Sequence, residues 1–273
     1  MPEFSIITPV YNAAEYLNET IKSVDSQKFT DYEWLVCDDG STDDSLQILK
    51  AAHKKNPRIR LYTQENSGVS AARNTCLKHL SGDYLMFLDA DDALADDCLQ
   101  VLHDQLVTTE ADLLIYGWYI HQNDQLFSYV FEQREIGSSA EDRYEMMLTD
   151  PYLCGGGYPW NKIWRIGAFD KIPEFDEQLH HYEDKLWTLE CLDHLNSPIV
   201  RFFNEPLYHY YLRGDSLSHT MSAEKLTQLA QYTLDSLEVL RDYISGHHPA
   251  ALKACNDMTQ DRLKAIVNVF EAK

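Results

Sequence analysis

The stretch LMFLDADD, residues 85–92, sets four apolar residues directly before three carboxylates, Asp89, Asp91 and Asp92. Its apolar half is typical of a buried β-strand, so the acids are expected where that strand ends. Two like charges about 4 Å apart cost about 1 kcal/mol in water and about 4 kcal/mol near a protein surface. This repulsion indicates that the strand ends at a site that uses the clustered charge.

The sequence before this stretch alternates strand-like and helix-like segments. Strands are expected at residues 4–12, 32–37, 58–64 and 83–92. Helices are expected at residues 13–27, from 41 onward and at 68–80. Ser41 or Thr42 is expected to cap the second helix. The alternation predicts a parallel, doubly wound α/β sheet with right-handed crossovers.

The rest of the chain is less regular. Strands are expected at residues 111–121, 128–133 and 197–213, with the first two paired. Helices are expected at residues 139–149 and 182–195. Two more helical patterns from residue 222 onward, with a break at 246–251, predict a helical C-terminal extension over 221–273. This extension either packs on the rest of the chain, forms a homodimer interface or lies against a membrane, and its mixed charge disfavours the membrane.

The charge balance of the 273-residue chain argues against some classes of partner. Twenty-three Lys and Arg against 44 Asp and Glu give a net charge of −21. Such an acidic chain is not expected to bind nucleic acid, or to bind anionic lipid unaided. The six cysteines form no Cys-x-x-Cys pair, which is typical of reduced core residues in a cytoplasmic protein. No signal peptide and no transmembrane segment are expected.

A second acidic pair, Asp38 and Asp39, follows another predicted strand. Ligands of open parallel sheets bind beyond the carboxyl ends of the strands, so both acid clusters are expected on one rim. Asp89 and Asp91 share a side of an extended chain, and their hard oxygen atoms favour Mg²⁺ or Mn²⁺. So few protein ligands imply a metal shared with the phosphates of a substrate. The alternative is that these acids only begin a turn and a helix.

Six segments, in order and spacing, resemble the inverting glycosyltransferases of family 2, which have the GT-A fold. These segments are SIITPVYNAAEYLNETIKSVDSQ, EWLVCDDGSTDDS, NSGVSAARN, DYLMFLDADD, YEDKLW and YYLRGDSLS. The resemblance implies a GT-A domain over residues 1–220, with a nucleotide-sugar-binding half at 1–95 and an acceptor half at 96–220. It implies a Rossmann-like, mostly parallel sheet with helices on both faces, followed by the helical extension.

The same resemblance implies roles for individual residues. Asp184 is expected to be the catalytic base, with Glu183 beside it. Asp91 and Asp89 are expected at the metal, Mn²⁺ or Mg²⁺, and Asp39 is expected to accept a hydrogen bond from uracil. The other residues expected to bind the donor are Pro9, Val10, Tyr11, Asn66, Arg73, Asp89, Arg213, Ser216 and Ser218.

Structural alternatives stand beside these roles. Arg73 is equally able to pair with a nearby acid, and Asp184 to provide the polarity of a first helical turn. Trp160 and Trp164 either stack on sugar rings or belong to the core. The glycines at 155–157 are either the hinge of an acceptor loop or a turn.

The implied reaction moves a sugar from a nucleotide-diphosphate donor, a UDP-sugar, to an acceptor hydroxyl with inversion. One rival is a nucleotidyltransferase that makes sugar nucleotides, but its usual Gly-rich basic loop is replaced here by PVYNAAEY. Another rival is a non-catalytic module that only binds nucleotide sugars. The resemblance further implies bacterial surface polysaccharide synthesis on a saccharide or lipid-linked saccharide acceptor, in the cytoplasm or peripherally at the inner face of the membrane.

Overall fold

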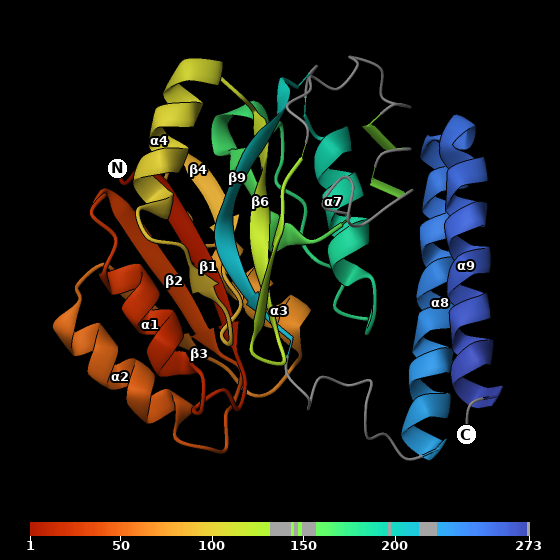
Figure 1. The fold of residues 1–273 in the computed structure, drawn as a ribbon, viewed down its shortest axis with the longest axis horizontal. Helices are drawn as coiled ribbons and strands as arrows, with labels where there is room; N and C mark the ends of the chain where they lie inside the picture. Colours follow the sequence, from red (N-terminus) through yellow and green to blue (C-terminus); the bar gives the residue numbers. More distant parts are fainter. Residues whose placement is uncertain (132–142, 145–146, 149–156, 196–197, 213–222, 272–273) are drawn as a thin grey trace.

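The computed structural model describes residues 1–131, 143–144, 147–148, 157–195, 198–212 and 223–271. A curved sheet forms the centre of the α/β body, and two long helices stand side by side along one side of it (Figure 1). The predicted α/β class with a mostly parallel Rossmann-like sheet is confirmed.

The nine described strands of the sheet follow the order β3-β2-β1-β4-β8-β6-β9-β5, and β7 pairs with β6. Strands β1 to β4 are parallel, and β8 is antiparallel to β4. The strands are β1 Phe4–Val10, β2 Tyr32–Asp38, β3 Ile59–Thr63, β4 Tyr84–Phe87, β5 Ala93–Leu94, β6 Leu113–Gln122, β7 Gln125–Tyr129, β8 Lys162–Arg165 and β9 Val200–Tyr211.

Helices connect the parallel strands, as the alternating pattern predicts. The α-helices described over most of their length are α1 Leu17–Asp25, α2 Ser45–Lys55, α3 Val69–Leu77, α4 Cys98–Thr109, α7 Glu183–Asp193, α8 Ala223–His247 and α9 Leu252–Glu271. Helix α3 packs on β1 and β2, and α1 contacts β5. A strand pairs with β6 as expected, but this strand, β7, spans Gln125–Tyr129, so only residues 128 and 129 of the predicted range 128–133 belong to it.

The predicted cap of the second helix is wrong. Helix α2 begins after Asp44, and Ser41 and Thr42 lie in the loop before it. Backbone N–H groups in this loop bond to Asn12 instead, whose Oδ1 accepts the N–H of Thr42 at 2.8 Å. The carboxylate of Asp43 accepts the N–H of Ser45 at 2.9 Å and so supplies the contact expected of a cap.

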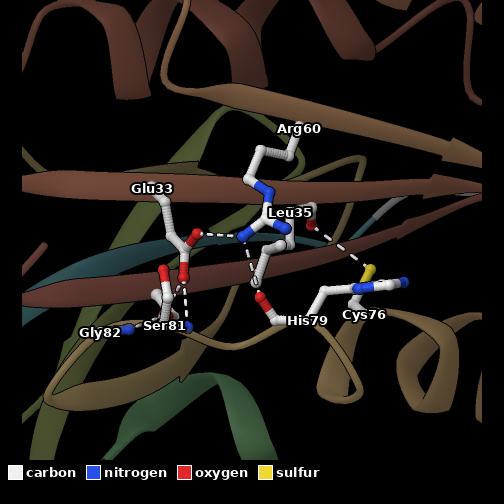
Figure 2. Close-up of polar contacts among 8 residues, drawn as sticks. Glu33, Leu35, Arg60, Cys76, His79, Ser81 and Gly82 are labelled. Atoms are coloured by element: carbon white, nitrogen blue, oxygen red, sulfur yellow. Dashed lines mark hydrogen bonds and ion pairs between the residues drawn. The ribbon is translucent and has the colours of Figure 1, made fainter. Parts of the chain in front are cut away.

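An ion pair between the buried Glu33 and the partly exposed Arg60 links β2 and β3 to the connection between α3 and β4 (Figure 2). Glu33 accepts hydrogen bonds from the Ser5 hydroxyl and the Ser81 N–H, both at 2.7 Å, and pairs with Arg60 at 2.7 Å. Burial works against the charged carboxylate, but these donors outweigh it and hold the pKa of Glu33 below its ordinary value. A Cβ at Gly82 would lie 2.7 Å from the Ser5 hydroxyl, so this close approach requires glycine.

The C-terminal hairpin of α8 and α9 packs on α7. Leu240 and Ile244 of α8 and Ala254 and Cys255 of α9 join the core of the body. Asp193, the last residue of α7, accepts hydrogen bonds from Tyr243 and, at 2.7 Å, from His248. Of the three roles considered for the extension, packing on the rest of the chain is therefore observed. Among the described residues, no helix is long and apolar enough to cross a membrane.

Candidate active site

The three acids of the DADD turn occupy different environments. Asp92 is buried, and its carboxylate accepts the Tyr208 hydroxyl at 2.8 Å and the Tyr211 N–H at 3.0 Å. Burial, followed by the charges of Asp89 and Asp91, raises the pKa of Asp92 well above its ordinary value. Asp92 therefore anchors β9, whereas Asp89 and Asp91 are only partly buried.

Arg73 joins the DADD turn to the start of α7. Its guanidinium is 7% exposed, bonds to Glu183 at 3.0 Å and lies 3.6 Å from Asp89. Burial alone would lower the pKa of Arg73, but the charges of Asp89, Glu183 and Asp184 outweigh burial and raise this pKa above its ordinary value. One buried cation thus offsets the repulsion among acids that belong to opposite halves of the body.

Asp184 lies in the first turn of α7, after Tyr182, whose backbone adopts the left-handed conformation with φ 58°. Such a backbone is uncommon for a bulky side chain and is often found at functional sites. Burial, and then the charge of Glu183, raise the pKa of Asp184 to about 7, against the opposing charges of Arg73 and Lys185. A carboxyl group with this pKa can exchange a proton near neutral pH.

Asp39 holds the loop after β3. Its Oδ1 accepts the Ser67 N–H at 2.9 Å and the Gln64 amide at 2.8 Å, and its Oδ2 accepts the Gly68 N–H at 2.8 Å. Asn66 is an exposed residue of this loop. Gly40 has φ 71°, and a Cβ there would lie 2.8 Å from the Asn66 nitrogen, so the two loops approach closely only because of the glycine.

The end of β1 opens on the same edge of the sheet. Val10 is buried, Pro9 is partly buried and Tyr11 is 51% exposed. The Val10 carbonyl accepts the Asp39 N–H at 2.8 Å, so the two predicted donor-binding segments are in contact. The chain then turns at Asn12, a non-glycine residue with φ 50°.

A pocket of about 340 Å³ lies beside the candidate base. The residues that line it are Gly157, Tyr158, His180, His181, Tyr182, Glu183, Asp184, Lys185 and Arg262. A Cβ at Gly157 would lie 2.4 Å from the Lys185 Cα, so this glycine lets the loop pack directly on α7. Arg262 comes from α9, and its place in the pocket could not be predicted from a helical pattern.

Other residues considered in the sequence belong to the core. Trp164 is fully buried, and Trp160 is 5% exposed and stacks on Tyr208 with ring centroids 4.7 Å apart. No sequence pattern indicated a role for Tyr208, whose hydroxyl also accepts the Asp89 N–H at 3.1 Å. The expected donor residues Arg213, Ser216 and Ser218 lie outside the described residues.

The site fits an open divalent-metal position. Within the described ranges, no group of three His, Cys, Asp or Glu side chains is arranged to hold a metal ion. Asp89 and Asp91 offer carboxylate oxygens, the ligands that Mg²⁺ and Mn²⁺ prefer. Two protein ligands suit a metal whose remaining positions are filled by phosphate oxygens and water.

An acidic rim at the carboxyl ends of parallel strands, facing a carboxyl group of raised pKa across one arginine, is the arrangement of a GT-A glycosyltransferase. The chain belongs to Glycosyl transferase family 2, whose family model matches residues 5–172. Sequence relatives agree. The chain is 30% identical over 249 residues to the glycosyltransferase GlyA of Streptococcus pneumoniae, covering 87% of this chain and 34% of that protein.

Two further relatives show how much of a longer protein the chain spans. It is 29% identical to the uncharacterized glycosyltransferase EpsJ of Bacillus subtilis, covering 80% of this chain and 63% of EpsJ. It is 29% identical to the teichoic acid poly(glycerol phosphate) polymerase of Staphylococcus epidermidis, covering 99% of this chain and 36% of the polymerase. The chain therefore spans about one third to two thirds of these relatives.

Solved structures share the fold. TarS 1–349 of Staphylococcus aureus, in complex with UDP-GlcNAc, superimposes with a TM-score of 0.66 at 24% identity, covering 85% of this chain and 66% of TarS. The mannosyltransferase PcManGT of Pyrobaculum calidifontis, in complex with GDP-Man and Mn²⁺, gives a TM-score of 0.55 at 16% identity, covering 99% of this chain and 79% of that chain.

Proposed function

We propose that the chain transfers a sugar from a UDP-sugar to an acceptor hydroxyl in one displacement that inverts the anomeric centre. The observation that carries this proposal is Asp184, a carboxyl group with a pKa of about 7, at a pocket joined through Arg73 to the acidic rim. TarS, which shares the fold, is known in complex with UDP-GlcNAc and with UDP.

In this mechanism Asp184 accepts the proton of the attacking hydroxyl. Glu183 sits beside it and raises its pKa, while the pairing of Glu183 with Arg73 keeps the first turn of α7 in position. The predicted donor pocket is formed by Pro9, Val10 and Tyr11 with the Asp39 and Asn66 segments. Asp39 keeps acceptor capacity on Oδ2, which accepts the Gly68 N–H, so a uracil N–H is a suitable additional donor.

Asp91, with Asp89, would hold Mn²⁺ or Mg²⁺. When bound there, the ion would neutralise the negative charge that develops on the departing diphosphate. Burial raises the pKa of Asp89, and the guanidinium of Arg73, 3.6 Å away, opposes this shift. Arg213, Ser216 and Ser218 remain proposed donor contacts on the strength of the family resemblance.

The rival functions lack comparable support. The loop after β1, PVYNAAEY, carries neither glycine nor a basic side chain for a triphosphate. A module that only binds nucleotide sugars has no need of a carboxyl group with a pKa near 7. We further propose a setting in bacterial surface polysaccharide synthesis, because relatives include the S. epidermidis teichoic acid polymerase and an Escherichia coli chondroitin synthase. In that setting the enzyme would act in the cytoplasm or at the inner face of the membrane.

The test is UDP release from a panel of UDP-sugars with a saccharide acceptor, in Mn²⁺ and in EDTA. Asp184→Asn should lower turnover by about 10²- to 10⁴-fold, because it removes the general base, and should leave the Kd for UDP unchanged. The exposed acid Asp176 provides a matched control, so Asp176→Asn should keep normal turnover. Near-normal turnover of Asp184→Asn would remove the assignment of the base. Release of pyrophosphate from UTP and a sugar phosphate would favour the nucleotidyltransferase instead.

A further inference from the structure

The C-terminal hairpin contributes one residue to the wall of the pocket beside Asp184. Arg262 of α9 lines it together with Lys185 of α7 and with His180 and His181 from the segment before α7. The pocket therefore brings basic side chains close to the candidate base, although the chain as a whole carries a net charge of −21.

Arg262 differs from the other cations of α9 in its partners. Lys253 pairs with Asp257 at 2.6 Å and Lys264 pairs with Asp261 at 3.0 Å. No hydrogen bond or ion pair joins Arg262 to another residue in the part of the chain that the structure describes. In a sequence with 44 acids for 23 Lys and Arg, a cation left without an acid at the wall of a pocket is unusual.

The electrostatic effect of Arg262 reaches the basic end of the pocket. After burial, which is the largest cause, Arg262 is among the charges that lower the pKa of Lys185, to about 8, and of His181. Lys185 also donates from Nζ to the Met147 carbonyl at 2.9 Å. The positive charges of Arg262 and Lys185 repel each other, and an anion between them would relieve that repulsion.

The acids of the pocket are already occupied in part. Glu183 is paired with Arg73 at 3.0 Å, and Asp184 accepts the Lys185 N–H at 2.6 Å. An anionic ligand at Arg262 would therefore lie near one acid that is already paired with Arg73 and a second, Asp184, whose pKa is about 7. The aromatic rings of Tyr158 and Tyr182 complete the wall and offer surfaces for a polyol or sugar.

We propose that this pocket is the acceptor subsite and that Arg262 binds a phosphate ester or phosphodiester of the acceptor, placing the acceptor hydroxyl beside Asp184. The inference rests on the proposed function and adds the chemical class of the acceptor. The guanidinium suits a phosphate because its planar fork forms two parallel charge-assisted hydrogen bonds. The phosphate would come from a soluble polyol phosphate or from the headgroup of a lipid-linked acceptor.

The experiment is calorimetric titration of sn-glycerol 3-phosphate into the full chain saturated with UDP and Mn²⁺, so that the donor site is filled. Arg262→Gln should weaken binding about tenfold, in line with loss of a charge-assisted hydrogen bond. The affinity of Arg262→Lys should lie between those of the wild type and Arg262→Gln, since lysine keeps the positive charge but lacks the planar fork of the guanidinium. Lys264→Gln removes the same charge from the same helix outside the pocket and should bind as the wild type does.

Glucuronate, a carboxylate, and undecaprenyl phosphate in detergent micelles are titrated in parallel. Binding of the micellar lipid alone, lost in Arg262→Gln, would support the subsite and identify the source as a lipid headgroup. Equal affinity of Arg262→Gln and wild type, or tighter binding of glucuronate, would overturn the inference. UDP binding with donor hydrolysis is measured separately. Intact donor chemistry without phosphate binding refutes only this subsite, whereas absent UDP binding refutes the proposed function.

Discussion

Arg73 is the residue that allows the acid cluster to exist. Asp89, Glu183 and Asp184 lie around one buried guanidinium, which is 3.0 Å from Glu183 and 3.6 Å from Asp89. Removing a buried cation from such a group leaves the acids without compensation, a change that typically costs about 3–5 kcal/mol. From the sequence, Arg73 could either bind the donor or pair with a nearby acid, and the structure shows the ion pair.

Asp184 predicts a particular pH dependence of activity. Its pKa is raised to about 7, so the ionised form that can accept a proton accumulates only as pH rises through that value. We expect turnover to increase about tenfold per pH unit below pH 7 and to level off above it. The measurement is the pH profile of kcat with a saturating donor and acceptor.

The same group links pH to stability with the opposite sign. Because the folded state binds the Asp184 proton more tightly than the unfolded state, this residue lowers the free energy of unfolding as pH rises from about 4 to about 7. Asp184→Asn should abolish this contribution, so the variant should gain stability relative to the wild type at pH 8.

A wild-type kcat profile that is flat between pH 5 and 8 would contradict the assigned base.

At the scale of elements, one strand fixes the geometry of the turn that carries the acids. The Tyr208 hydroxyl of β9 donates to Asp92 and accepts from the Asp89 N–H, and β5 extends the turn by pairing with β9. From α1, Thr20 donates to the Ala90 and Asp92 carbonyls at 2.9 and 2.8 Å. The turn is therefore held from two directions before any ligand binds.

Tyr208→Phe should destabilise the fold by about 1–3 kcal/mol, because the buried Asp92 carboxylate and the Asp89 N–H each lose a partner. Urea unfolding measures the free energy. Tyr119→Phe removes a phenolic hydroxyl from the neighbouring strand β6 and keeps the ring that stacks on His209, so it serves as the control. An unchanged unfolding free energy for Tyr208→Phe would show that the hydroxyl does not hold the turn.

The elements that could be predicted are those with local patterns. The runs that became β1 to β4 and the helices between them carry their own periodicity and turn residues. Strand β5 has only two residues, Ala93 and Leu94, and exists because it meets His209 and Tyr208 far along the chain. Likewise, most residues of α7 are buried, so this helix lacks the apolar stripe of a surface helix.

At the scale of the whole molecule, the hairpin and the α/β body share one core. Ile244 of α8 is fully buried, and Tyr144 stacks on His248 with ring centroids 3.5 Å apart. The sequence could show the helices and their break, but not which surface they cover. For the same reason the position of Arg262 could not be predicted, since helical periodicity does not identify the partner of a polar face.

The shared core predicts that hairpin and body unfold together. The five tryptophans, Trp34, Trp118, Trp160, Trp164 and Trp187, all lie in the body. Their fluorescence and the helical circular dichroism should therefore give coincident urea transitions. Ile244→Ala should lower the free energy of unfolding from both transitions by about 2–4 kcal/mol, because buried volume is lost. Val239→Ala, at a residue that is 39% exposed, should change this free energy little. A fluorescence transition unaffected by Ile244→Ala would mean that the hairpin unfolds independently.

Because Arg262 belongs to α9, the pocket is completed late in the synthesis of the chain. A ribosome makes the acidic rim and Asp184 first, and Arg262 follows 78 residues after Asp184. A growing polypeptide can thus assemble the nucleotide side while the opposite side is still open to water. The basic wall of the pocket is complete only when the middle of α9 has been made.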